Sequence, residues 1–545
     1  MAFWRAFTRP VHYAALVAGA VPALAFPAPN LEFLAWFGLV PGMLLFRAAP
    51  SARQAAVRGW WFGAGFLLAS LYWLVLNLGP GLLLVAAVTG VLWTGVGAAT
   101  WGLLRPPVTL LRALAALAVV PSCWLVADWA RSWQGFGGPW AVYGASQWQH
   151  PVFLALAALG GVWLVSFALV AANTGIMIWV VAPRLPVRLI GAAAAAIAIA
   201  AGPVAYALTS AAPVSRHVTI AIVQPGVVHN PAQRVDASQR LSADLSRYRA
   251  DLIVWGESSV AYDLDLPRNA WLLHQLERLS AANGAQILAN QDSITPNGDK
   301  SKVAVLIGST GVDGRYVKTR LVPFGEYIPF RQQLGWLTKI SKAAPQNTVA
   351  GNGARVMRVT PSRGGPLTIG VLICFESAFP DMSRVDTDQG AQLIVYQTSD
   401  STWQAGWEWV LAQHAALGAL RAAESGRPDI QAALTGDSVA FDPRGRLLAW
   451  KGSTFRGVAE LRIALPSASS RTLYDRLGDY VPWTAVTIAV LAGAIAWIRT
   501  GRLRIRPHRP AGIPLDGSAR RDRSGVAAGP APEGGSPAAT PRNEQ

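Results

Sequence analysis

The sequence predicts a multi-pass α-helical membrane bundle joined to an α/β domain that lies outside the cytoplasm. Three observations support this fold class. The chain is 52% hydrophobic and only 14% charged, with a mean hydropathy of +0.31, which is unlike a soluble protein of 545 residues. Its first third and a segment near its end are long and apolar. The region between them alternates short β-branched runs with amphipathic stretches, as layered α/β folds do.

The apolar segments have the length of membrane-spanning helices. A helix needs roughly 20 residues to cross the hydrocarbon core. About eight segments meet this requirement, and they are expected at residues 11–27, 31–47, 59–77, 80–103, 108–129, 151–182, 188–209 and 480–498.

Basic residues gather in alternate loops between these segments. Arg47 and Arg53, Arg105 and Arg112, and a run from Arg499 follow alternate predicted spans, whereas "NLGPG" carries no charge. Short cytoplasmic loops hold Lys and Arg, so both termini are expected in the cytoplasm and the middle region outside. Alternatively, the first segment is a cleaved signal peptide, since it has a basic start and an apolar centre, but that leaves the alternation of basic loops unexplained.

The expected domain limits follow from these changes in composition. A membrane domain of about seven helices covers 1–213, the α/β domain covers 214–479, and a last helix covers 480–498. The tail, 499–545, is basic and rich in Pro, Gly and Ala, so we expect it to be disordered in the cytoplasm. It is either a solvated topological anchor or a segment attracted by anionic lipid.

Charge and cysteine content exclude several classes of function. The formal charge of +17 resides mostly in loops and the tail, which indicates membrane topology and predicts no nucleic-acid partner. Cys123 and Cys374 are the only cysteines, and Cys123 lies in an apolar segment, so a disulfide is not expected. No paired His or Cys occurs at ligand spacing, so we expect neither a metal nor a cofactor.

Three ionisable residues follow predicted strands of the middle region. Glu257 follows "LIVW", Lys318 follows "GRYV", and Cys374 follows "LTIGVLI". The other runs that predict strands are "HVTIAIVQ", "AQILANQ", "KVAVLIGST" and "AQLIVYQTS". Loops beyond strand ends are held by a rigid sheet, so these three side chains are candidates for one reactive site.

The three residue types fit covalent acyl chemistry. A Cys thiol needs a base or a positive neighbour to act as a nucleophile at neutral pH. Glu257 would take the proton, and Lys318 would favour the thiolate and stabilise an oxyanion. Each residue, taken singly, also has a structural interpretation. Cys374 could be a small buried hydrophobic residue, Lys318 a surface residue of a strand, and Glu257 a helix N-cap partner. His414 is an alternative base, although a lone histidine on an apolar helix is usually structural.

Three sequence blocks resemble the catalytic blocks of the nitrilase, or carbon-nitrogen hydrolase, superfamily. They are "IVWGES", "KTRLVPFGEYIP" and "ICFES", around Glu257, Lys318 and Cys374 respectively. The second is closest to a membrane branch, the bacterial apolipoprotein N-acyltransferases, and "GGPWAVYGASQ" resembles that branch's loop between helices. The resemblance implies a nitrilase-like αββα sandwich on a multi-pass protein of the bacterial plasma membrane.

The resemblance also implies a reaction. Cys374 would attack a phospholipid ester, with Glu257 as base and Lys318 steadying the oxyanion, to give a thioester and a lysophospholipid. The α-amino group of a diacylglyceryl-modified apolipoprotein would then take the acyl chain. The implied partners are therefore the phospholipid donor, the apolipoprotein acceptor and the bilayer. Glu326 and Glu376 match further family carboxylates that either orient the site or stabilise the fold.

The sequence departs from the family at several positions. Gly256 replaces a common Pro and Phe375 a common Tyr, while "VQPGVVHNPAQR" and "TSDSTWQAG" also differ. These departures keep two alternatives open, a membrane-tethered amidase and a catalytically silent lipoprotein-binding scaffold. Apolar side chains near the domain's loops are expected either to dip into the membrane interface or to pack on the domain. They are Trp336, Leu337, Trp403, Trp407 and Trp409.

Overall fold

The computed structural model describes most of the chain. The described residues are 10–209, 212–243, 245–295, 297–339, 344, 346–403 and 407–504, without the side chains of Tyr248, Leu337 and 500–504. The predicted tail lies outside them from residue 505 onwards. The chain divides into a compact unit, Met1–Ala494, and a second unit, Ile495–Gln545.

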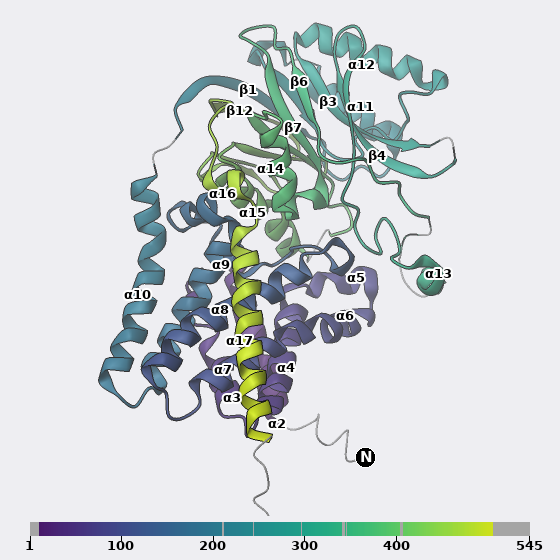
Figure 1. The fold of residues 1–545 in the computed structure, drawn as a ribbon. Helices are drawn as coiled ribbons and strands as arrows, with labels where there is room; N and C mark the ends of the chain where they lie inside the picture. Colours follow the sequence, from purple (N-terminus) through teal and green to yellow (C-terminus); the bar gives the residue numbers. More distant parts are fainter. Residues whose placement is uncertain are drawn as a thin grey trace, which may run out of the picture. The chain divides into compact units, whose positions relative to one another are not determined.

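Within the described residues, five helices are long and apolar enough to cross a membrane. They are Gly81–Leu104 (α6, Gly81–Gly90, with α7, Thr94–Leu104), α8 (Leu110–Arg131), α9 (Pro151–Val181), α10 (Leu185–Leu208) and the Tyr480–Arg499 part of α17 (Tyr480–Arg504) (Figure 1). Each coincides within a few residues with a predicted span.

The other three predicted spans are shorter or bent. The span expected at 59–77 is α4 (Ala52–Ser70) followed by Tyr72–Leu78 (η3, Tyr72–Leu74, and α5, Val75–Leu78) at an angle of 71°. The first two are α2 (Pro10–Ala20) with η1 (Val21–Ala25), and η2 (Glu32–Trp36) with α3 (Val40–Arg47). Prolines at the starts of η1 and α3 explain the interruptions, because proline cannot donate a helical hydrogen bond.

Glycines let the first helices pack at backbone distance. A Cβ on Gly65 of α4 would lie 1.9 Å from the carbonyl oxygen of Leu16 in α2, and a Cβ on Gly19 would lie 2.0 Å from that of Phe62. Small residues serve this purpose between membrane helices. This contact makes α2 part of the helical bundle.

Two sheets form the core of the α/β domain among the described residues. The first has the order β12-β1-β2-β3-β4-β5, and the second β11-β10-β9-β8-β7-β6. The first comprises β1 (Val214–Gln224), β2 (Leu252–Trp255), β3 (Gln286–Ile294), β4 (Lys300–Ile307), β5 (Val312–Val317) and β12 (Gly457–Pro466). The second comprises β6 (Val356–Val359), β7 (Leu367–Ile373), β8 (Leu393–Thr398), β9 (Asp429–Ala433), β10 (Ser438–Phe441) and β11 (Leu447–Lys451). The centre of each sheet is parallel, β1-β2-β3 and β7-β8-β9.

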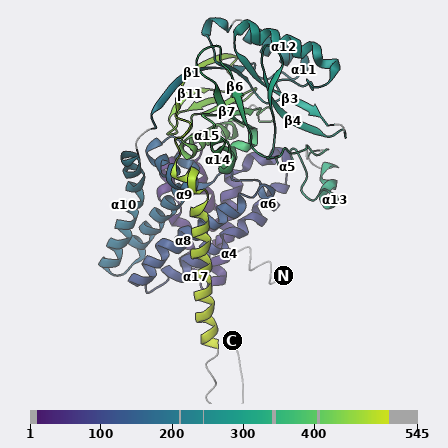
Figure 2. The same ribbon diagram turned by 45° about the horizontal axis from the view of Figure 1, so that its top comes forward.

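Helices cover the outer faces of both sheets. Helices α11 (Pro231–Ser242) and α12 (Ala270–Asn283) pack on the first sheet, and α14 (Pro380–Asp388) and α15 (Glu408–Ser425) on the second (Figures 1 and 2). The result is the αββα sandwich expected of a nitrilase-like domain. Helix α15 is buried along almost its whole length because it lies between the second sheet and α9.

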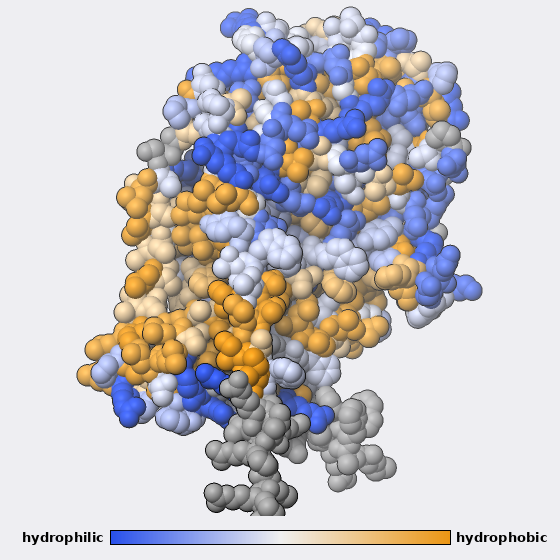
Figure 3. Space-filling model, in the orientation of Figure 1, coloured by the Kyte–Doolittle hydropathy of each residue, from blue (hydrophilic) through white to orange (hydrophobic). Residues whose placement is uncertain are grey.

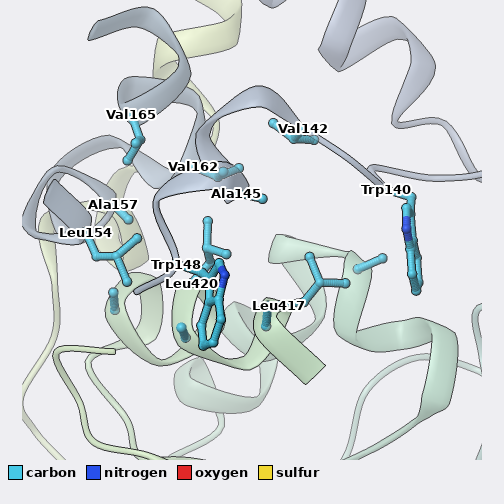
Figure 4. Packing of buried hydrophobic residues seen from close by; sticks show 14 of the residues in the cluster. Trp140, Val142, Ala145, Trp148, Leu154, Ala157, Val162, Val165, Leu417 and Leu420 are labelled. Atoms are coloured by element: carbon cyan, nitrogen blue, oxygen red, sulfur yellow. The ribbon is translucent and has the colours of Figure 1, made fainter. Parts of the chain in front are cut away.

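The hydrophobic core continues from the helices into the α/β domain. Leu417 and Leu420 of α15 lie beside Trp148 and Leu154, which belong to the helical half (Figure 4). All four side chains are buried, and Leu154 is fully inaccessible to solvent. The α/β domain is thus packed on the bundle rather than tethered to it.

Candidate active site

Glu257, Lys318 and Cys374 each follow a strand, as predicted, and the structure brings them together. Glu257 lies two residues after β2, and its backbone N–H donates to the carbonyl of Thr398 at the end of β8, 3.1 Å away. Lys318 follows β5 directly, and its Nζ lies 3.2 Å from Glu257 Oε1. Cys374 follows β7 and is close enough for the charges of both residues to change its pKa.

Glu326 joins this group. Its Oε1 accepts a hydrogen bond from Lys318 Nζ at 2.8 Å, and its Oε2 accepts from the backbone N–H of Val322. Lys318 is only 1% exposed, so two carboxylates neutralise one buried ammonium group. Burial lowers the pKa of Lys318, but Glu257 and Glu326 outweigh it and hold that pKa well above its usual value.

The surroundings of Cys374 disfavour ionisation of its thiol. Burial raises its pKa well above the ordinary value, the charge of Glu257 raises it further, and Lys318 opposes both. A base beside the sulfur is therefore needed to form the nucleophile, and Glu257 is placed for that task.

Glu376 braces the site and does not contact Lys318. Its Oε1 accepts from the backbone N–H groups of Thr319 (2.7 Å) and Arg320 (2.9 Å) and from the hydroxyl of Tyr316 (2.7 Å). Its Oε2 accepts from the N–H of Ile373 at 2.7 Å. This fully buried carboxylate ties the segment after Lys318 to the residue before Cys374.

Gly256 and Phe375, two departures from the family pattern, have local physical reasons. A Cβ on Gly256 would lie 2.0 Å from the backbone nitrogen of Leu434, so the chain passes too closely for a larger residue. The ring of Phe375 packs edge-on against Phe379, with centroids 5.1 Å apart. Both rings also close on Gly138, where a Cβ would lie within 3.0 Å of each.

His414 and Asp400 adjoin Cys374. The sequence offered His414 as an alternative base or as a structural residue, and it did not indicate Asp400 as its partner. His414 Nδ1 lies 3.0 Å from Asp400 Oδ1, and Nε2 lies 3.2 Å from the carbonyl oxygen of Cys374. A carbonyl oxygen only accepts hydrogen bonds, as does an ionised carboxylate, so these two partners favour the imidazolium form of His414. Burial lowers the pKa of His414, but the charge of Asp400 outweighs it, so the net shift is upward. Asp400 lies in "TSDSTWQAG", the segment already noted as unusual.

A metal is not needed to explain this cluster. One potential ligand atom from each of Cys374, Asp400 and His414 lies within 4.8 Å of the others. The ring nitrogens, however, already face a carboxylate and a carbonyl oxygen. The arrangement therefore fits a buried ion pair better than a metal site.

A cavity of about 350 Å³ opens beside Cys374. Leu74, Leu78 and Val85 of the bent segment and α6 form one wall, while Phe324 and Phe330 of the α/β domain form another. Cys374, Phe375 and His414 also line it. A predominantly apolar cavity lined by a nucleophile is suited to an acyl chain.

Tryptophans of the α/β domain pack against the helical bundle near the cavity beside Cys374. Trp403 packs edge-on against Trp73 (5.2 Å), and Trp407 stacks on Tyr72 (5.5 Å), so both contact the bent segment after α4. Trp409 also packs on Tyr72, whereas Trp336 is 55% exposed. The side chain of Leu337 lies outside the described residues.

Comparisons with known proteins match both halves of the chain. The family model "Apolipoprotein N-acyltransferase N-terminal domain" matches residues 18–175, and "Carbon-nitrogen hydrolase" matches 219–470. An apolipoprotein N-acyltransferase of Chlorobaculum tepidum is 26% identical, covering 89% of this chain and 96% of that protein. One of Vibrio vulnificus is 28% identical, covering 91% and 97%.

Solved structures are similar to the α/β half at lower identity. Saccharomyces cerevisiae Nit3, a member of branch 10 of the nitrilase superfamily, is 16% identical with a TM-score of 0.35, covering 47% of this chain and 93% of that one. The two family models together cover both the helical bundle and the α/β domain, and the relatives named above align along nearly the whole chain. The chain belongs to the apolipoprotein N-acyltransferase family.

Proposed function

We propose that this protein transfers an acyl chain from a phospholipid, through a thioester on Cys374, to the α-amino group of a diacylglyceryl-modified apolipoprotein. The observation that carries the proposal is the position of Cys374. It lies beside the Lys318–Glu257 pair and lines an apolar cavity walled partly by membrane helices.

In the first half-reaction Glu257 takes the thiol proton, and the sulfur attacks the ester carbonyl of the phospholipid. Negative charge develops on the carbonyl oxygen, and Lys318, a cation held by two carboxylates, stabilises it. The intermediate then breaks its C–O bond. The lysophospholipid leaves with the proton from Glu257, and the acyl group stays on Cys374.

In the second half-reaction the acceptor's amine attacks the thioester. Glu257 takes a proton from the nitrogen, the C–S bond breaks, and the proton returns to the sulfur. The products are an amide and the original thiol, so no further reactant is needed. Both substrates carry acyl chains, which explains why the cavity has a wall of membrane helices.

The proposal includes a topology of eight membrane elements. It counts Pro10–Ala25, the segment at 32–47 and the bent pair as membrane elements beside the five long helices. Domain limits at 1–213, 214–479, 480–498 and 499–545 place the α/β domain outside and both termini in the cytoplasm. Impermeant thiol labelling of single cysteines placed at Arg53 and Arg268 of a Cys-free variant tests it, with labelling of intact cells expected only at 268.

An acyl-adduct experiment tests the chemistry. Purified protein is incubated with a phospholipid labelled in its acyl chain, and the protein is examined for a covalent, hydroxylamine-sensitive label. Wild type and Cys123→Ala should carry the label, and Cys374→Ala should not. Folded wild type without a label would overturn the thioester mechanism.

A diacylglyceryl lipopeptide added to the labelled enzyme distinguishes transfer from hydrolysis. A transferase converts the lipopeptide to its N-acyl form, whereas an amidase-like enzyme releases free fatty acid. A protein that binds the lipopeptide and forms neither product would be a silent scaffold.

A further inference from the structure

A second cavity, far larger than the active-site cavity, lies between α9, α10 and the edge of the α/β domain. Its volume is about 680 Å³. We call it the junction cleft and define it by Leu154 and Leu159 of α9, Tyr206 of α10, and the four arginines Arg444, Arg446, Arg471 and Arg476. It shares no lining residue with the cavity beside Cys374.

The rim of the junction cleft is strongly cationic. Four arginines line it, against one carboxylate, Asp442. Asp442 Oδ1 accepts hydrogen bonds from the backbone N–H groups of Arg444 (2.8 Å) and Arg446 (2.9 Å). This oxygen therefore stabilises the backbone turn that begins at Asp442. Arg471 is paired with Asp388 and Asp475. The positive charge at the rim therefore comes from Arg444, Arg446 and Arg476.

The guanidinium groups retain donors for a ligand. Arg444 donates to the carbonyl of Thr209 and lies 4.4 Å over the ring of Tyr206, and Arg446 donates to the Tyr206 hydroxyl. Each guanidinium has five N–H donors, of which these bonds use one. Arg476 makes no side-chain hydrogen bond or ion pair with any other residue in the part of the chain that the structure describes.

The inner wall of the junction cleft is largely apolar. Ala158 and Leu159 line it from α9 and Tyr206 from α10, while the fully buried Leu154 lies beneath this wall. In the space-filling view the helices form an apolar surface that meets the hydrophilic surface of the α/β domain above them (Figure 3). The cleft spans this boundary, since it is lined by both halves.

We propose that the junction cleft binds one anionic phospholipid, with its phosphate among the arginines and an acyl chain along α9 and α10. Arginine binds phosphate through paired, charge-assisted hydrogen bonds. A lipid fits better than free phosphate because the apolar wall would otherwise face water. The bound lipid fills the space between α10 and the α/β domain, a site separate from catalysis.

A photo-crosslinking experiment tests this proposal. The full-length protein is placed in nanodiscs with a trace of phosphatidylglycerol that carries a photoreactive acyl chain, and crosslinked peptides are mapped by mass spectrometry. We expect crosslinks in α9 and α10 near Leu154 and Tyr206, with at least tenfold fewer from a matched phosphatidylcholine probe. Equal crosslinking by both probes would overturn the requirement for an anionic headgroup.

Arg476→Glu supplies the decisive variant, because Arg476 holds no other side chain in place. It should reduce the junction-cleft crosslinks at least tenfold and leave those in the active-site cavity unchanged, which also shows that the variant is folded. The matched control is Arg268→Glu, an exposed arginine beside α12. Unchanged crosslinking in Arg476→Glu, or its complete loss on adding inorganic phosphate, would overturn the proposal.

Discussion

At the scale of single residues, the position of Cys374, the proposed nucleophile, depends on an unusual backbone conformation. Cys374 has a φ of +53°, in the left-handed region, which costs a residue with a Cβ on the order of 1–3 kcal/mol. Glu376 accepts the N–H of the preceding Ile373, and His414 faces the carbonyl of Cys374. These contacts on either side of the residue help to hold this conformation.

His414 is expected to position Cys374 and to favour its thiolate. Replacing the imidazolium in His414→Asn removes a positive charge near the sulfur, so the thiol pKa should rise by about one unit, equivalent to about 1.4 kcal/mol. The measurement is the rate of Cys374 alkylation against pH, which should fall about tenfold near neutrality. Asp400→Asn removes the partner that raises the pKa of His414, but it also removes a negative charge that itself raises the thiol pKa, so its profile should shift less than that of His414→Asn. An unchanged profile in both variants would leave His414 with only a packing role.

Replacing Gly256 with proline, the more common residue of the family, is expected to destabilise the domain. In Gly256→Pro or Gly256→Ala the new Cβ meets the Leu434 nitrogen, and overpacking of this kind costs roughly 1–3 kcal/mol. Glu257 is the next residue, so acyl-adduct formation should fall at least tenfold. Thermal unfolding and adduct assays measure the two effects. Gly102→Ala, at a helical site with no atom within 4 Å of the new Cβ, controls for loss of a glycine, and equal behaviour of the two variants would refute the steric explanation.

At the scale of elements, a break in α9 joins the bundle to the α/β domain. Gly160 and Gly161 leave helical geometry, and the freed N–H of Val162 donates to Glu424 Oε1 of α15 at 2.7 Å. Glu424 also pairs with Arg421, 3.1 Å away. A carboxylate from one half of the molecule thus caps a helix of the other.

Glu424 should make stability depend on pH. Burial raises the pKa of Glu424 to about 7, against opposition from Arg421 and the Val162 N–H. An acid whose pKa is higher in the folded state than in the unfolded state stabilises the fold fully at pH values below its unfolded-state pKa. That contribution is lost as the pH rises through the folded-state pKa. Between pH 4.5 and 7, the free energy of unfolding of wild type should therefore fall by about 3 kcal/mol relative to that of Glu424→Gln. Thermal unfolding at pH 5 and pH 8 measures it. Glu460→Gln, on an exposed residue, should follow wild type, and a Glu424→Gln profile parallel to wild type would contradict the assignment.

Elements with a strong periodic signal were predictable from the sequence, and those shaped by tertiary contacts were not. Buried runs such as β7 and β8 are continuous and apolar, as parallel strands are. The short edge strands β5 and β6 carry a mixed pattern of burial, and "VMRV" gave no signal. The 71° bend after α4 was missed because the helices on either side of it are equally apolar, and hydropathy does not show in which direction a helix runs.

The same distinction applies to the site. Glu257, Lys318 and Cys374 could be predicted because each ends a recognisable strand. The pairing of Asp400 with His414 could not, since the residues are separated along the chain and neither lies in a motif. Likewise, Glu376 and Glu326 looked equivalent in sequence. Only the structure shows that Glu326 accepts a hydrogen bond from Lys318, whereas Glu376 accepts from backbone N–H groups such as that of Thr319.

At the scale of the whole molecule, neither half contains the active-site cavity alone. Leu78 and Val85 come from the bundle, Phe324 and Phe330 from the α/β domain, and Cys374 also lines the cavity. The length of acyl chain that the enzyme accepts should therefore depend on residues of the membrane helices that never touch the reacting atoms.

Narrowing the helical wall should shorten the accepted chain. Val85→Trp places an indole in a cavity of about 350 Å³. Each methylene excluded from apolar surroundings costs about 0.8 kcal/mol, so excluding two would slow adduct formation with a long-chain phospholipid roughly tenfold. A short-chain donor should lose much less, because its chain ends before the obstruction. Adduct formation measured with both donors gives the ratio. Val91→Trp, on an exposed residue of the same hydrophobic span outside the cavity lining, should leave the ratio unchanged. Equal slowing of both donors by Val85→Trp would mean that the acyl chain does not lie along this wall.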